Sequence, residues 1–259
     1  SKGWFGEIFD ISCAFLSGLP MGREVYVRVP KEGLPGTDNT KPIRPYSLLR
    51  LLKAAYGLQE APRLWYQQLK RILEAMGFTE LRVNRGIFTY HIITMDKEGR
   101  AQSSELICML GIHVDDGSLF GNKDHPKYKQ IRRALDKEFD IKEWKSLRGN
   151  KDVDYLGMQW TQFDDATVEV NMIKYVENLS VHQMTTEKPE TEILTEELKT
   201  VYKSLHAKLR WPVSHVIPEY AYRVSALSQK SRDHLMYGDL YALNDLVEDV
   251  KNSVEAGLT

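Results

Sequence analysis

The chain has 259 residues, 42% of them hydrophobic and 27% charged, so it can build a sizeable core and is not wholly disordered. Its 35 basic and 36 acidic residues give a net charge of -1, which excludes a uniformly basic nucleic-acid coat but allows a local basic channel. Two cysteines, Cys13 and Cys108, are too few for a disulfide scaffold and predict a reducing compartment. No apolar run approaches the ~18 residues of a membrane span, so no membrane partner is expected.

Strand and helix patterns alternate in the first part of the chain. In order, they predict a strand at residues 4–10, a strand at 24–29, a proline-rich loop at 31–45, a helix at 61–77 and a strand at 86–94. The helix is the clearest element, because Pro62 suits its first turn and Gly77 suits the position after its last.

In the remainder of the chain, every element predicted after residue 172 is a helix, apart from one linker. In order, the patterns predict a hairpin at 106–121, a helix at 125–139, a hairpin at 154–172, a helix at 173–182, a polar linker at 183–194 and helices at 196–211, 218–230 and 239–255. This order indicates a mixed α/β fold of the α+β class, with domains at 1–185 and 186–259. The chain starts at Ser1 and enters a strand pattern at once, and we interpret it as a piece of a longer polypeptide.

Three aspartates form the strongest candidate site. Asp10 ends the first strand, and Asp115 and Asp116 lie at the tip of the hairpin at 106–121. Carboxylates are the ligands that Mg²⁺ prefers, and two such ions can support an in-line phosphoryl transfer. Adjacent strand residues point to opposite faces, so we expect one of the pair, Asp115, to be the closer ligand. The alternative is that the pair is an ordinary turn, since aspartate is common there.

Basic residues gather in two segments. Residues 41–72 carry seven basic residues against Glu60 alone, and residues 123–137 carry a second basic run on the predicted helix. Such segments are commonly solvated faces, and they indicate nucleic-acid binding only where chemistry lies beside them.

Several short motifs follow one another along nearly the whole chain. They are DISCAFLSG at residues 10–18 with EVY at 24–26, AYGL at 55–58 with APRLWY at 61–66, GIHVDD at 111–116, DYLGM at 154–158 and a helical stretch at 202–225. In this order they resemble the reverse transcriptase of copia-type LTR retrotransposons. Three positions depart from the family pattern: His113 stands where tyrosine is usual, Glu60 where glutamine is common, and Asn84 where an acid is usual.

The resemblance implies a fold and a set of site residues. The fold is a right-hand polymerase palm with a ferredoxin-like antiparallel sheet over residues 1–185, including part of the fingers, followed by a helical thumb or connection region over 186–259. The catalytic metal ligands are Asp10, Asp115 and Asp116. The residues near the incoming nucleotide are Phe15, Tyr56 and Gly57. The residues on the template–primer backbone are Arg63, Lys70, Arg71, Lys129, Arg132 and Arg133.

The resemblance and the residue type indicate two different roles for Phe15. The resemblance implies an aromatic ring that stacks beneath the incoming sugar and excludes a 2′-hydroxyl, whereas the residue type alone favours simple core packing. Tyr56 and Gly57 lie near the templating base in the family, and glycine there allows close approach, but the pair also suits a turn. Arg63 either contacts a phosphate or covers the helix surface.

The resemblance also implies the chemistry and its setting. The reaction is RNA-directed DNA synthesis by a nucleotidyltransferase that uses two Mg²⁺ ions, for which Mn²⁺ can substitute. The expected partners are an RNA or DNA template–primer, deoxynucleoside triphosphates and the rest of a Pol polyprotein with its ribonuclease H and integrase. The expected location is cytoplasmic, in a virus-like particle, or nuclear.

Two alternatives use the same residues. One is an inactive or repurposed copy that binds nucleic acid without catalysis, and the other is a metal-dependent phosphodiesterase. Only nine residues precede Asp10, so the basic finger strands of the family are missing, and we expect this piece alone to polymerise poorly.

Overall fold

The computed structural model describes residues 3–36, 40–184 and 186–255. Its contacts divide the chain into two compact units, one of Ser1–Gly149 with Asp164–Ala166 and one of Asn150–Phe163 with Thr167–Thr259. Strands are paired antiparallel throughout the first unit and helices dominate the second, which confirms the α+β class. The division falls before the predicted boundary at 185/186, because the last strands of the chain join the helical unit.

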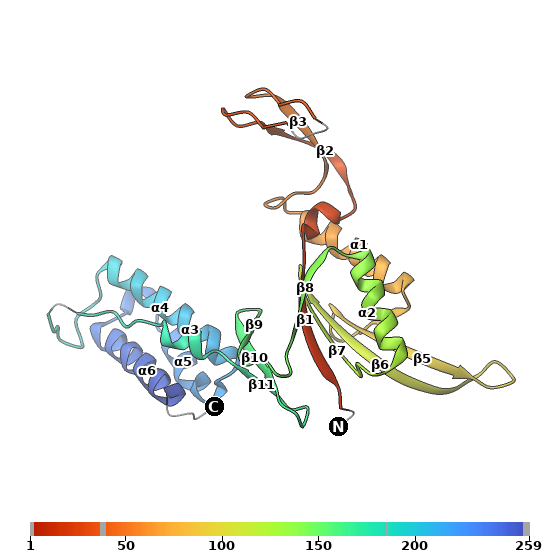
Figure 1. The fold of residues 1–259 in the computed structure, drawn as a ribbon. Coiled ribbons are helices and arrows are strands. Elements are labelled where there is room, and N and C mark those ends of the chain that lie inside the picture. The colour runs from red at the N-terminus through yellow and green to blue at the C-terminus, as the bar shows by residue number, and fades with distance from the viewer. Residues whose placement is uncertain (1–2, 37–39, 185, 256–259) are drawn as a thin grey trace. The chain divides into compact units, whose positions relative to one another are not determined.

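The first unit is built on one six-stranded antiparallel sheet (Figure 1). In sheet order its strands are β4 (Phe78–Glu80), β5 (Ile87–Met95), β6 (Ala101–His113), β7 (Asp116–Gly121), β1 (Phe5–Ile11) and β8 (Ile141–Ser146). Helices α1 (Ala61–Ala75) and α2 (Pro126–Glu138) connect β1 to the β4–β5 extension and β7 to β8. With that extension set aside, the order β6-β7-β1-β8 is the ferredoxin-like arrangement that the resemblance implied.

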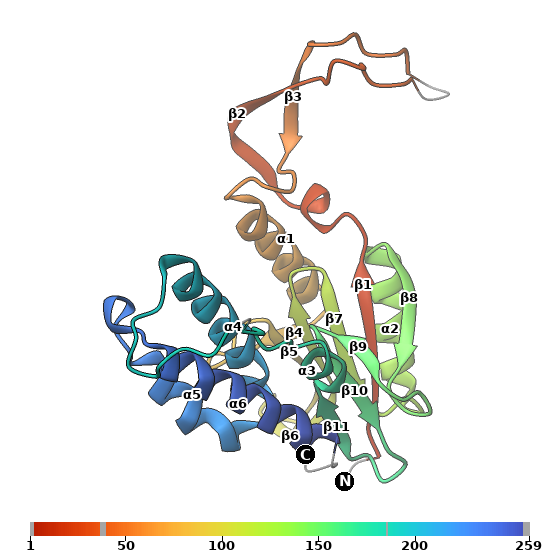
Figure 2. The same cartoon turned by 90° about the vertical axis from the view of Figure 1, so that its left-hand side faces the viewer.

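Both helices cover the same face of this sheet. Their apolar stripes share one core with the inward residues of the strands. The fully buried members include Trp65, Leu69, Leu110, Leu119 and Leu135. Figure 2 shows β1 between β7 and β8, with the two helices behind the sheet. The carboxyl end of β1 and the β6–β7 hairpin are therefore held from behind by packed helices.

A two-stranded ribbon extends away from the sheet after β1 (Figures 1 and 2). A short 3-10 helix, η1 (Ala14–Ser17), leads into β2 (Pro20–Arg28), which pairs antiparallel with β3 (Leu48–Lys53). The sequence predicts β2 but not β3, because the run LLRLLK lacks period-two alternation. The intervening loop is predicted correctly in the part that is described, and residues 37–39 lie outside it.

The second unit combines a small sheet with a helical core. Its strands are β9 (Val153–Tyr155), β10 (Met158–Gln162) and β11 (Val168–Asn171), and its helices are α3 (Ile173–Glu177), α4 (Glu196–His215), α5 (Ala221–Ser228) and α6 (Tyr237–Glu255). Two 3-10 turns, Pro218–Tyr220 and Arg232–His234, flank α5. Leucines and valines of the last four helices form one buried cluster. Among the described residues no helix is long and apolar enough to cross a bilayer.

Helix α4 runs beyond its predicted end at residue 211 and contains Pro212. Proline has no backbone N–H, so the carbonyl of Lys208 loses its intrahelical donor. The hydroxyl of Tyr175 donates a hydrogen bond to this carbonyl at 3.0 Å. A neighbouring helix thus satisfies the group that the proline leaves unpaired, and the helix continues to His215.

Candidate functional site

The three predicted acids come together at one edge of the first unit. Asp10, next to the end of β1, stands directly opposite Asp116, the first residue of β7. Opposed residues of antiparallel strands have Cα atoms about 4.5–5.5 Å apart and side chains on the same face. The backbone N–H of Ile11 donates to the carbonyl of Asp115 at 2.9 Å, which fixes the third acid at the same place.

The register corrects two details of the sequence-based expectation. The direct cross-strand neighbour of Asp10 is Asp116 and not Asp115. The hairpin tip is the pair Val114 and Asp115, because His113 and Asp116 already face each other as strand partners. The reason is a two-residue turn that places Asp116 inside β7, where its side chain follows the pleat of the sheet.

The turn itself holds a backbone conformation that valine rarely adopts. Val114 has φ of 60°, in the left-handed region, where a β-branched side chain costs about 1–2 kcal/mol. The indole N–H of Trp65, a 2%-exposed residue of α1, donates to the carbonyl of Val114 at 2.6 Å. Helix α1 therefore anchors the residue next to Asp115 from below.

The carboxylates of Asp10 and Asp115 repel that of Asp116. Partial burial raises the pKa of Asp116 above its ordinary value, and the charges of Asp115 and Asp10 raise the same pKa further. His113, its partner on β6, lowers that pKa in opposition. Asp116 thus stands between a carboxylate on one strand and an imidazole on the other, and a bound cation would relieve the repulsion.

The donor chemistry of this cluster fits Mg²⁺ as an open site. In the described part of the chain, no group of three or more His, Cys, Asp or Glu side chains is placed so that it could hold a metal ion by itself. Magnesium takes only one or two carboxylates from a protein and completes its octahedron with water and substrate phosphate. Asp10 and Asp116, from neighbouring strands, supply that number of carboxylates, and Asp115 lies beside them at the turn.

Two aromatic rings lie beside the acids. Phe15 of η1 is half-buried and its ring centroid is 4.6 Å from that of the exposed Tyr56. Partial desolvation raises the pKa of Tyr56, and the charges of Asp115 and Asp10 contribute, which places its hydroxyl in the field of the cluster. Gly57 follows with φ of 92° and open space where a Cβ would stand. The structure thus brings Phe15, Tyr56 and the acids together.

The negative charge of Glu60 is compensated inside the first unit. Its carboxylate accepts hydrogen bonds from the guanidinium of Arg23 on β2 at 2.6 and 2.9 Å. These bonds, with help from Arg63, lower the pKa of Glu60 to about 2. The departure from the family pattern at this position therefore adds an ion pair between β2 and the start of α1.

The six predicted backbone-binding residues fall into two groups. Those with exposed side chains are Arg63 and Arg71 on α1 and Lys129 and Arg133 on α2. The ammonium of Lys70 lies 2.6 Å from Glu80. Arg132 is bound to Asp136 at 2.7 Å, and its guanidinium lies 4.3 Å from the centroid of the Trp144 ring. The charges of Lys70 and Arg132 are therefore already engaged in the fold.

A family model and several known proteins match most of the chain. Residues 1–194 match the family model described as reverse transcriptase (RNA-dependent DNA polymerase). The chain belongs to this reverse transcriptase family. It is 34% identical over 146 residues to the retrovirus-related Pol polyprotein from transposon RE2 of Arabidopsis thaliana, and 25% identical over 241 residues to that from transposon RE1.

The relatives differ greatly in length from this reverse transcriptase chain. The matched parts are 56% and 88% of this chain but only 9% and 15% of the RE2 and RE1 polyproteins. A putative transposon Ty5-1 protein of Saccharomyces cerevisiae is 24% identical over 238 residues, which are 86% of this chain and 69% of that protein. The domain is therefore of the kind found within retrotransposon Pol polyproteins.

Sequence reasoning missed two structural residues of this reverse transcriptase domain. Trp65 lies within the predicted helix at 61–77, where a buried indole N–H needs a hydrogen-bond partner, and that requirement was the available signal. Glu80 has a side chain only 9% exposed and accepts bonds from Tyr66, Lys70 and the backbone of Gly86. Nothing in the local sequence separates Glu80 from a solvated glutamate.

Proposed function

We propose that this domain catalyses RNA-directed DNA synthesis, in which the 3′-hydroxyl of a primer attacks the α-phosphate of a deoxynucleoside triphosphate and pyrophosphate leaves. The observation that carries the proposal is the register that sets Asp10 opposite Asp116, with Asp115 at the adjoining turn. Two carboxylates on neighbouring strands and a third at the adjoining turn form an anionic site on a hydrogen-bonded backbone, which limits the reorganisation that the reaction needs.

Each acid has a stated task in this proposal. Asp10 and Asp116 would hold the divalent ions from neighbouring strands, and Asp115 would supply the third carboxylate from the turn. When bound, two Mg²⁺ ions lower the pKa of the attacking hydroxyl and neutralise charge on the leaving pyrophosphate, and Mn²⁺ can take their place. Burial of Leu110 and Leu119 in the adjoining strands keeps the hairpin in place while the substrates exchange.

The nucleic acid and the nucleotide occupy the surroundings of the acids. The nucleotide sugar would lie against Phe15, with Tyr56 and Gly57 close to the templating base. Arg63, Arg71, Lys129 and Arg133 would contact backbone phosphates and give salt-dependent binding of low sequence specificity. Lys70 and Arg132 would instead support the fold.

The setting follows the same proposal. The first unit would act as the polymerase palm and the helices of the second as a thumb or connection region. The domain would work within a Pol polyprotein beside ribonuclease H and integrase, in a cytoplasmic virus-like particle with access to the nucleus. The polyprotein relatives support this context.

Primer extension tests the proposal directly. A labelled primer on an RNA template is incubated with this chain, deoxynucleotides and Mg²⁺ or Mn²⁺, next to a version extended at its N-terminus. We expect extension that needs template and nucleotides and that is stronger in the longer version, because finger residues would add cationic contacts to the triphosphate. Metal-dependent cleavage of the primer without nucleotides, and no extension in either version, would instead indicate a phosphodiesterase.

Phe15→Ala is expected to relax discrimination against ribonucleotides by roughly 10-fold or more, because removing the ring opens space for a 2′-hydroxyl. The measurement is the ratio of kcat/KM for a deoxynucleotide and its ribonucleotide in single-nucleotide extension. Phe163→Ala, at an exposed position in the other unit, is the matched control and should leave the ratio unchanged. If the ratio is unchanged in Phe15→Ala, the ring of Phe15 only packs against Tyr56 and does not select the sugar.

A further inference from the structure

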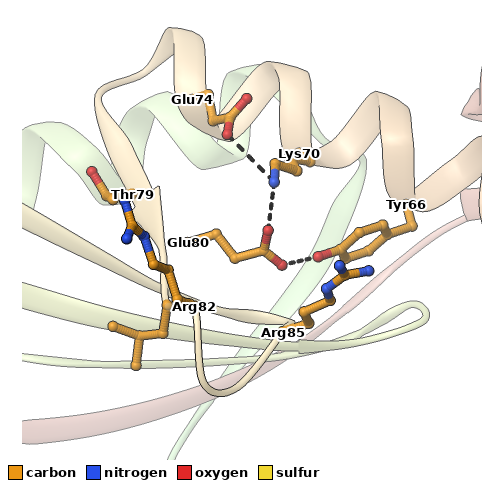
Figure 3. A pocket seen from close by; sticks show the side chains of 8 residues that line it. Tyr66, Lys70, Glu74, Thr79, Glu80, Arg82 and Arg85 are labelled. Carbon is orange, nitrogen blue, oxygen red and sulfur yellow. Dashed lines mark hydrogen bonds and ion pairs between the residues drawn. The ribbon is translucent and has the colours of Figure 1, made fainter.

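A cavity of about 400 Å³ lies between helix α1 and the turn that joins β4 to β5. Figure 3 shows Tyr66, Lys70 and Glu74 on the helix side and Glu80 in the middle. Arg82 and Arg85 extend from the turn on either side of Glu80, Arg82 beside Thr79 and Arg85 beside Tyr66. The cavity thus combines two acidic and three basic side chains on rigid elements.

Other groups of the protein already bind both acidic side chains of the cavity. Glu80 accepts hydrogen bonds from the hydroxyl of Tyr66, from Lys70 at 2.6 Å and from the backbone N–H of Gly86 at 3.2 Å. The ammonium of Lys70 lies 3.7 Å from Glu74 as well. One lysine thus neutralises much of the charge of both carboxylates, and the pair of acids offers little to a further cation.

The remaining positive charge of the cavity lies on Arg82 and Arg85. Both side chains are exposed, and within the described residues neither Arg82 nor Arg85 forms an ion pair. They stand three positions apart on a turn whose last residue, Gly86, is fixed by Glu80. Each guanidinium group on this turn presents planar, forked donors that match the oxygens of a phosphate.

The turn is joined directly to the strand that carries the acid hairpin. The carbonyl of Gly86 accepts a hydrogen bond from the N–H of Ile112 at 2.8 Å, and Ile87 pairs with Gly111. Gly86 has φ of 85°, and a Cβ there would come within 2.8 Å of the Ile112 carbonyl oxygen, so the close approach requires glycine. Ile112 is followed by His113, the strand partner of Asp116.

We propose that the Arg82–Arg85 turn and its cavity bind two neighbouring backbone phosphates of the template–primer, one at each arginine. The proposal rests on the proposed polymerase function, because the same polynucleotide must place its reacting end at the acids of β7 and β1, on the far side of β6. A phosphate held on this turn fixes the duplex relative to the hairpin through the Gly86–Ile112 hydrogen bond. The role of Glu80 is to hold the turn, and it has no direct contact with the ligand.

Equilibrium binding in the absence of metal tests the site without catalysis. A fluorescent template–primer is titrated with the full chain in EDTA at 50 to 200 mM KCl, and the affinity is plotted against salt on logarithmic axes. The variant is Arg82→Gln with Arg85→Gln. The control is Lys97→Gln with Arg100→Gln, which removes the same charge from exposed residues at the opposite end of β5.

We expect the salt slope of the arginine variant to fall by about 2, since each lost phosphate contact lowers it by about 1. The control should keep the parental slope. Arg82→Lys with Arg85→Lys should restore most of it, which separates lost charge from lost fold. Equal slopes for the arginine variant and the control would overturn the proposal.

A second binding experiment distinguishes phosphates of the template–primer backbone from those of a nucleotide. Inorganic triphosphate is titrated alone, because it resembles a nucleotide tail and carries no duplex backbone. If the arginine variant weakens triphosphate binding and leaves the template–primer slope unchanged, the cavity belongs to the nucleotide and the proposal is wrong. Failure of primer extension in the parental chain would refute the polymerase function alone, because the binding experiment needs no catalysis.

Discussion

Replacing Asp115 by Asn is expected to lower template-directed extension by at least about 10³-fold while raising the stability of the fold. The loss corresponds to about 4 kcal/mol of transition-state stabilisation and reflects a missing metal ligand. The gain in stability has a separate cause. Asp115 lies beside Asp116, whose pKa is raised partly by the charge of Asp115. Removing that charge relieves repulsion worth about 1 kcal/mol at short range in a solvated setting.

The two effects are measured under different conditions. Extension is followed with Mg²⁺, and unfolding by urea is followed in EDTA, since a bound divalent ion would reverse the sign of the stability change. Asp124→Asn makes the same chemical change at an exposed aspartate of the first unit and should alter neither quantity. Extension near the parental rate, or a destabilised fold in EDTA, would show that the acid cluster is assigned wrongly.

Trp65→Phe is expected to slow extension by about 10²-fold although Trp65 touches no substrate. The phenylalanine keeps most of the packing against Phe139 but loses the N–H that holds the carbonyl of Val114. Without this bond the strained turn can relax toward negative φ and carry Asp115 out of position. A displacement of about 1 Å at a reacting centre has an effect of this size. The lost bond itself should cost about 1 kcal/mol of stability.

A second substitution distinguishes positioning from general loss of structure. Glycine adopts φ of 60° without strain, so Val114→Gly should keep the turn in place without the indole. We expect the double variant Trp65→Phe with Val114→Gly to recover at least 10-fold of the lost kcat, whereas Val114→Gly alone should change kcat little. A double variant as slow as Trp65→Phe would show that the hydrogen bond does not position Asp115.

Local periodicity predicted those elements whose two faces differ clearly. Helices α1 and α2 begin and end within two residues of the predicted bounds, because each has an apolar stripe and a proline in its first turn. Strand β3 was missed since LLRLLK has no alternation. Helix α3 ends at Glu177, well before the predicted end at residue 182, because a weak local pattern does not define a terminus.

The sequence alone identified the family of this domain and supplied its three candidate acids. Asp10, Asp115 and Asp116 stand in short motifs whose order along the chain carries the resemblance, and the family model confirms that resemblance. These features are local, and a linear pattern is sufficient to display them.

The tertiary structure decided which residues meet. It set Asp116 opposite Asp10, placed the indole of Trp65 under Val114, and tied the Arg82–Arg85 turn to the hairpin through Gly86. Each of these contacts joins residues far apart in the chain, and each depends on strand register or on which helix face is buried. A shift of one residue in register would turn every side chain of a strand to the other face, and only the packing of the whole sheet against its helices excludes that shift.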